Sequence, residues 1–170
     1  AYVDRGLAFY WKADYEAALS DFTEALQLNP VYGMAYWLRG EVHAKKGDPD
    51  SAIADLTEAL RLGNTFYRIY FCRGNAYWQK GDYDSAISDL TEAIRLEPAF
   101  AHAFYWRGMS HSENGDSDSA IADYTEAIRL EPSFYNSFDS RGHELFKKGE
   151  YDAAIAHYTE IIRLDPEPPF

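Results

Sequence analysis

The sequence is poor in cysteine, in positive charge and in long hydrophobic runs, and each shortage excludes a class of protein. Its 170 residues contain one cysteine, Cys72, so no disulfide can form within the chain. Against 28 Asp and Glu residues there are only 16 Lys and Arg, giving a formal net charge of -12. This balance argues against nucleic acid or an anionic membrane surface as a partner. No apolar run approaches the roughly 18 residues that a membrane-spanning helix needs.

The signatures of catalysis and of targeting are missing as well. There is no glycine-rich phosphate loop, no GxSxG turn and no HExxH pair. The histidines are scattered, and a lone cysteine is usually a small buried hydrophobe, so a site built on Cys72 and His102 is the weaker alternative. We therefore expect no enzyme activity, no cofactor and no metal. No signal peptide is visible, which favours a soluble, cytoplasmic protein, and any earlier targeting segment would precede Ala1.

What the chain does contain is an internal repeat. The segment KGDYDSAISDLTEAIRLEP at residues 80–98 recurs as NGDSDSAIADYTEAIRLEP at 114–132 and as KGDPDSAIADLTEALRLGN at 46–64. An Arg-Gly pair precedes each copy and returns every 34 residues, at Arg5, Arg39, Arg73, Arg107 and Arg141. A fixed period of this length is typical of helical repeat arrays, in which each unit is too small to bury a core of its own.

Each copy is predicted to form two antiparallel helices. We number positions within a copy so that the glycine of the Arg-Gly pair is position eight. Helix A runs up to a Gly-Asp step, whose acidic residue is expected to cap helix B, and Pro49 suits the first position of such a helix. Helix B ends at a proline, or at Gly63-Asn64, where glycine allows a left-handed cap. The short turn sets the glycine at position eight opposite the alanine at position twenty, so that the two backbones approach closely.

These positions resemble the tetratricopeptide repeat family over essentially the whole chain. The shared features are an aromatic fourth residue, the eighth glycine, the alanines at twenty and twenty-seven, an aromatic or leucine at twenty-four and the proline at thirty-two. The resemblance implies an all-α fold, a right-handed superhelical solenoid of antiparallel helix pairs. It also implies a single solenoid over 1–170, with repeats at about 1–32, 33–66, 67–100, 101–134 and 135–168.

Position seven departs from the family, which usually has leucine there. This chain has arginine in all five copies, level with an aspartate at position twenty-three in four copies and with His157 in the fifth. We expect ion pairs within the repeats, as in Arg39 with Asp55, the arginine stem packing as leucine would. The alternative is that the arginines point into water. On helix B, Glu92 and Arg95 are spaced to support the helix.

The resemblance also implies that the A helices line a concave groove with positions two, five, six, nine, twelve and thirteen. Chaperone-binding relatives carry a lysine and asparagine set there that holds a carboxylate, and only Asn75 and Arg68 of this chain match it. The groove is instead aromatic and nearly neutral, although we expect roughly a third of its rings to pack between helices. The candidate binding residues are Met34, Trp37, Leu38, Arg68, Phe71, Cys72, Asn75, Trp78, His102, Tyr105, Trp106 and Met109.

Three functional hypotheses follow. The favoured one is a protein-protein interaction scaffold that binds a peptide or a helix of a partner protein in the groove. The second is self-assembly through the terminal repeats, with the last helix contributing Tyr158, Ile161 and Ile162 because the tail EPPF covers little. The third is the regulatory arm of a larger protein.

Overall fold

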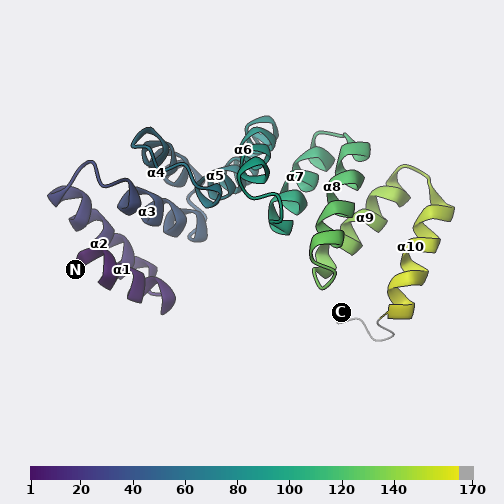
Figure 1. Cartoon of the computed structure of the whole chain (residues 1–170), viewed down its shortest axis with the longest axis horizontal. Helices are drawn as coiled ribbons and strands as arrows, with labels where there is room; N and C mark the ends of the chain where they lie inside the picture. The colour runs from purple at the N-terminus through teal and green to yellow at the C-terminus, as the bar shows by residue number, and fades with distance from the viewer. Residues whose placement is uncertain (165–170) are drawn as a thin grey trace. The chain divides into compact units, whose positions relative to one another are not determined.

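The computed structural model describes residues 1–164, and their secondary structure is entirely helical (Figure 1). The chain divides into two compact units. The first, Ala1–Glu97, contains α1 (Tyr2–Trp11), α2 (Tyr15–Leu28), α3 (Gly33–Lys45), α4 (Pro49–Arg61), α5 (Tyr67–Lys80) and α6 (Tyr83–Leu96). The second, from Pro98 onward, contains α7 (Ala101–Glu113), α8 (Ser117–Leu130), α9 (Tyr135–Lys147) and α10 (Tyr151–Leu164). The predicted all-α class is confirmed, and one continuous solenoid over 1–170 stays a prediction.

The helix boundaries fall where the repeat places its capping residues. Asp48 accepts a hydrogen bond from the backbone N–H of Ser51 and so caps α4, which Pro49 opens. The corresponding aspartates before α2, α6 and α8 make the same bond. Gly63 has a φ of 88°, the left-handed conformation predicted at the end of α4. Local sequence chemistry therefore fixes the length of these helices.

The two helices of a pair touch through the small residues at positions eight and twenty. A Cβ built on Gly74 of α5 would lie 2.9 Å from Leu90 Cγ and 3.3 Å from the carbonyl oxygen of Ala86, both on α6. Ala86 and Leu90 are fully buried. The predicted close approach of the paired helices is confirmed, and it leaves no room for a side chain at position eight.

The layers of the first unit follow from its contacts. Helices α1, α3 and α5 lie side by side, and α2, α4 and α6 pair with them as the other layer (Figure 1). In the second unit α8 packs against both α7 and α9, and α10 packs against α9. We call the odd-numbered helices the A helices, as in the repeat.

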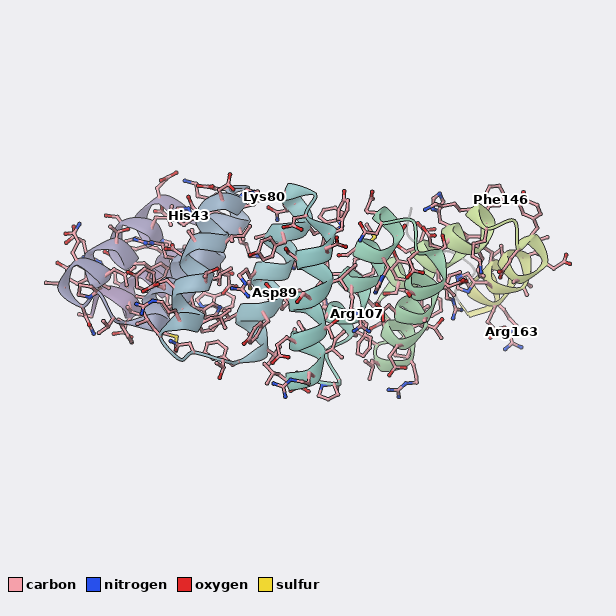
Figure 2. All side chains as sticks on the ribbon, turned by 90° about the horizontal axis from the view of Figure 1, so that it is seen from above. His43, Lys80, Asp89, Arg107, Phe146 and Arg163 are labelled. Atoms are coloured by element: carbon pink, nitrogen blue, oxygen red, sulfur yellow. The ribbon has the colours of Figure 1, made fainter. Side chains whose placement is uncertain are left out.

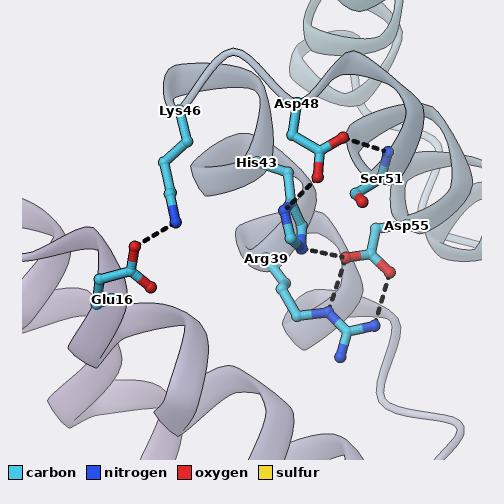
Figure 3. Close-up of polar contacts among 7 residues, drawn as sticks. All are labelled: Glu16, Arg39, His43, Lys46, Asp48, Ser51 and Asp55. Carbon is cyan, nitrogen blue, oxygen red and sulfur yellow. Dashed lines mark hydrogen bonds and ion pairs between the residues drawn. The ribbon is translucent and has the colours of Figure 1, made fainter.

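The predicted arginine–aspartate pairs form inside the first four repeats. Arg39 donates from Nε and Nη2 to the two carboxylate oxygens of Asp55, each at 2.7 Å, beside the ring of His43 (Figure 3). Arg73–Asp89 and Arg107–Asp123 repeat this geometry at 2.7–2.8 Å. The carboxylates are buried rather than partly exposed, since Asp89 is only 6% exposed (Figure 2 shows its place on the ribbon).

The fifth repeat carries His157 at that position and pairs differently. Arg141 Nη2 lies 2.7 Å from His157 Nδ1, and His157 Nε2 lies 2.7 Å from the carbonyl oxygen of Phe138, to which it donates. Arg141 Nε has no hydrogen-bond partner within residues 1–164. Burial lowers the pKa of His157, and the Arg141 guanidinium lowers it further, so that the ring is neutral at pH 7.

Successive repeats within a unit are linked by lysines at the ends of A helices. Lys46 contacts Glu16 of the preceding repeat (Figure 3). In the same way Lys80 Nζ lies 2.5 Å from Asp50 Oδ1, and Lys148 Nζ lies 2.5 Å from Asp118 Oδ1. The acidic partners are largely exposed, so these lysine links lie on the surface.

Candidate functional site

The predicted binding residues belong to the A helices of both units, and each unit presents its own set. The unit 1 A-helix face consists of Met34, Trp37, Leu38, Arg68, Phe71, Cys72, Asn75 and Trp78 on α3 and α5. The unit 2 A-helix face consists of His102, Tyr105, Trp106 and Met109 on α7.

Two residues of the unit 1 A-helix face pack largely against other side chains of the protein. Leu38 is 8% exposed and belongs to the buried cluster around Phe22 and Val42. The Trp37 ring meets Phe66 edge to face, with centroids 4.6 Å apart. Both side chains therefore help to build the core, and little of Leu38 is left to touch a ligand.

The same packing recurs in unit 2, where Phe134, the residue before α9, contacts rings of α7. Tyr105 meets Phe134 with ring centroids 4.9 Å apart, and His102 stacks on Phe134 at 4.6 Å. Phe66 and Phe134 both stand at position thirty-four, which is aromatic in the first four copies. The recurring aromatic residue at position thirty-four is the sequence signal that the rings at position five are covered. The groove prediction did not take this signal into account.

Polar side chains on and beside the unit 1 face are partly paired. The Tyr10 hydroxyl donates to Glu41 Oε1 at 2.7 Å, joining α1 to α3. Arg68 is exposed and donates to the hydroxyl of its neighbour Tyr67 at 3.2 Å. Burial, with Glu41 nearby, raises the pKa of Cys72 to about 12, so the thiol is protonated at neutral pH and a poor nucleophile.

An indole N–H and an amide oxygen of this face have no hydrogen-bond partner among the described residues. They are the indole N–H of Trp37 and the amide oxygen of Asn75, and both atoms are buried although their residues are half-exposed. An unpartnered buried donor or acceptor costs free energy until a ligand or water meets it. Together they offer one donor and one acceptor.

Unit 2 also holds a cavity of about 360 Å³ between α7, α8 and α9, which we call the α9 cavity. Glu144 on α9 lines it and is 2% exposed. The α9 cavity was not predicted. Its sequence signal is a charged residue at position ten, where the other copies have Ala8, Val42, Ala76 and Ser110. The complete lining is Met109, Ser112, Glu113, Tyr124, Asp139, Ser140, His143, Glu144 and Lys147.

The predicted self-association residues on α10 differ in exposure. Tyr158 is half-buried, its ring lying against Gly142 of α9, and Ile161 is half-buried as well. Ile162 is 60% exposed, and Ile155, which the predicted set does not include, is 64% exposed. The tail EPPF lies outside the described residues.

None of the helices in residues 1–164 combines the length and the hydrophobicity that a membrane span requires. No group of three or more His, Cys, Asp or Glu side chains in that range is arranged to hold a metal ion.

Several solved structures are similar to this chain along most of their length. A crystal structure of MamA matches with a TM-score of 0.88 and 26% identity, covering 95% of this chain and 88% of that one. YrrB, described as a TPR protein with an unusual peptide-binding site, matches with a TM-score of 0.85 and 21% identity, covering 98% and 86%. MamA from Desulfovibrio magneticus RS-1 matches with a TM-score of 0.91 and 19% identity, covering 99% and 96%.

A search of curated proteins found no match. Family models, in contrast, match nearly the whole chain: two models, both described as tetratricopeptide repeat, cover residues 3–65, 73–133 and 135–168. Because these matches coincide with the helix pairs that recur along the structure, this chain belongs to the tetratricopeptide repeat family.

Proposed function

We propose that this chain is a non-catalytic interaction scaffold that binds an extended segment of a partner protein on its A-helix faces. The observation that carries the proposal is the pair of unpartnered buried atoms on the unit 1 face, Trp37 Nε1 and Asn75 Oδ1. A peptide backbone carries a carbonyl for the first and an N–H for the second. YrrB, which shares the fold, is described as peptide-binding, and this supports the same class of ligand here.

The neighbouring side chains suit a segment with apolar anchors. Phe71 and Cys72 are half-buried, so part of each remains accessible beside Asn75. Arg68 on α5 and Glu41, beside the face on α3, carry one charge of each sign, which leaves this surface close to neutral. Affinity would therefore come from a few buried apolar residues of the partner, with backbone hydrogen bonds fixing its direction.

The test is a selection from a displayed library of random 12-residue peptides, followed by fluorescence anisotropy with the selected sequences. We expect Phe71→Ala, Trp106→Ala and Asn75→Ala to weaken binding while the helical circular dichroism stays nearly unchanged. Tyr151→Ala is the matched control, since Tyr151 is an aromatic residue, 57% exposed, at the start of the B helix α10 and lies outside both faces.

Two results would count against the proposal. Peptides that bind all of these variants as tightly as the unmodified chain would place the binding surface elsewhere. Loss of helical signal in Phe71→Ala would show that this ring is part of the core.

A second candidate function, self-assembly, is favoured by the exposure of α10. At position twenty-one Ile53, Ile87 and Ile121 are half-buried, whereas Ile155 is 64% exposed. Position twenty-eight shows the same contrast between Leu26, 7% exposed, and Ile162, 60% exposed. A second copy of the chain docking on this face would bury both isoleucines.

Light scattering over a concentration series decides this second candidate. We expect the mass to rise with concentration, and the double variant Ile155→Lys, Ile162→Lys to stay at the monomer mass. A constant monomer mass for the unmodified chain at the highest concentration would remove it.

A further inference from the structure

Glu144 occupies a position at which the fold does not require a charged residue. Position ten is buried in the second to fifth repeats, where Val42, Ala76 and Ser110 are fully buried and Glu144 is 2% exposed. Because three sibling repeats complete the same helix pair with a small or apolar residue, packing gives no reason for a carboxylate here. Burying an ionised carboxylate costs free energy unless partners compensate it.

The partners of Glu144 compensate only one of its oxygens. Oε1 accepts from the Ser112 hydroxyl at 2.5 Å and from Lys147 Nζ at 3.2 Å. Oε2 is buried and has no hydrogen-bond partner among the described residues. Burial alone would raise the pKa of Glu144, but the bonds from Ser112 and Lys147, together with the nearby Ser117, outweigh it and the pKa is lowered. The group is therefore an anion at neutral pH with one unmet acceptor.

The surroundings of the α9 cavity add to the negative charge. Glu113 and Asp139 also line it, so that three carboxylates face the single ammonium of Lys147, with His143 beside them. Asp139 stands at position five, where the second to fourth repeats carry an aromatic ring. The buried ring of Tyr124 forms part of the wall. A carboxylate-rich cavity with an aromatic wall suits a planar cation.

We propose that the α9 cavity binds the guanidinium of an arginine side chain in the partner segment, an inference that rests on the proposed function. A guanidinium donates two parallel N–H bonds to a carboxylate, and so meets both Oε1 and Oε2 of Glu144. An ammonium is a less complete partner, since Lys147 already contacts Glu144 and leaves Oε2 unmet. The cavity volume of about 360 Å³ is in the range of ligand pockets.

In the free protein the ammonium of Lys147 contacts Glu144 where the guanidinium would bind. Its side chain is 47% exposed, and its contact with Oε1 is a long one of 3.2 Å. The ammonium therefore moves into solvent at low cost when the guanidinium arrives. The consequence is that Lys147 competes with the ligand, and removing it should strengthen binding.

The experiment is a titration of the ¹⁵N-labelled full chain with N-acetyl-arginine methylamide, followed by two-dimensional NMR. The isosteric neutral probe N-acetyl-citrulline methylamide and the lysine analogue are run in parallel. We expect shifts of backbone amides in α7, α8 and α9 with the arginine probe, weaker ones with the lysine probe and none with the citrulline probe.

The variants sharpen the test. Glu144→Ala should weaken the arginine probe at least about tenfold, the loss of one charged hydrogen-bonding partner, while its melting temperature stays the same or rises, as the sibling alanines indicate. Glu144→Gln serves as the second variant should the alanine chain fail to fold. Lys147→Gln should tighten the probe several-fold, and Arg163→Gln, which removes one positive charge from exposed α10, should leave it unchanged.

The inference is overturned if the citrulline probe binds as well as the arginine probe, or if Glu144→Ala binds arginine normally. Its failure is distinguishable from that of the proposed function. Selected peptides that lose binding in Phe71→Ala but keep it in Glu144→Ala would leave the scaffold function standing without the arginine site. An arginine probe that binds a chain for which no peptide can be selected would support the arginine site and remove the scaffold function.

Discussion

Replacing Gly74 by alanine sets two effects of known size against each other. Within a helix the change from glycine to alanine favours folding by about 1 kcal/mol. Against this, the new Cβ would lie 2.9 Å from Leu90 Cγ, a branch point of a fully buried side chain, and 3.3 Å from the backbone oxygen of Ala86. The Ala86 oxygen cannot move without shifting α6, and Leu90 Cγ can move only by rotating a side chain that is fully buried. Overpacking of this kind costs about 1–3 kcal/mol, and with two confined neighbours we take the upper part of that range.

The net expectation for Gly74→Ala is a loss of about 1–2 kcal/mol, or roughly 2–8 °C in melting temperature for a chain of this size. Thermal unfolding followed by circular dichroism at about 222 nm measures it. Gly142→Ala is the informative comparison, because its new Cβ would meet the Tyr158 ring still more closely, yet that ring is half-buried and can swing aside. We expect the smaller loss there. A Gly74→Ala chain that melts at or above the unmodified temperature would refute the close-approach reasoning.

Three further changes test the polar contacts. Asp89→Asn removes the charged partner of Arg73, whose side chain is only 17% exposed, and should cost about 2 kcal/mol in urea unfolding; a loss below about 0.5 kcal/mol would mean that the pair is solvated. Since burial lowers the folded pKa of His157, the unfolded chain takes up a proton first as the pH falls below about 6.5, and stability should drop until the folded pKa is passed. In His157→Asp, which restores a carboxylate for Arg141, that drop should shrink, and an unchanged pH profile would exclude His157 as its source. With its pKa raised to about 12, Cys72 should react with iodoacetamide far more slowly at pH 8 in the native chain than in urea, and equal rates would contradict the raised pKa.

Features that depend on one repeat alone could be predicted from the sequence. The capping by Asp48, the left-handed Gly63 and the bidentate Arg39–Asp55 pair each follow from spacing inside a single helix pair. Helix B also behaves as predicted, since Arg95 donates to Glu92 three residues earlier at 2.6–2.9 Å. Their common cause is the short turn, which fixes which residues of the two helices are level.

Features that depend on how repeats meet could not be predicted in the same way. Phe66 covers Trp37 because the chain folds back after α4, and the helical period says nothing about the direction of that connection. Glu144 acquires its partner Ser112 only when α9 lies against α7, 32 residues away in sequence. The exposed fraction of Leu38 likewise depends on packing by neighbouring helices. The position-by-position comparison of copies does reveal such residues, because departures from the repeat stand out against it.

The lysine links have a consequence for cooperativity. In a repeat array the stability of each helix pair and the coupling between neighbouring pairs are separate quantities. The Arg73–Asp89 type of pair is buried and acts within one repeat, whereas Lys80 reaches an exposed carboxylate of the preceding repeat. Dissolved salt screens exposed charges much more than buried ones. Raising the ionic strength should therefore leave each helix pair intact while weakening its coupling to the neighbouring pairs. The repeats of a unit should then unfold less cooperatively, over a broader thermal transition.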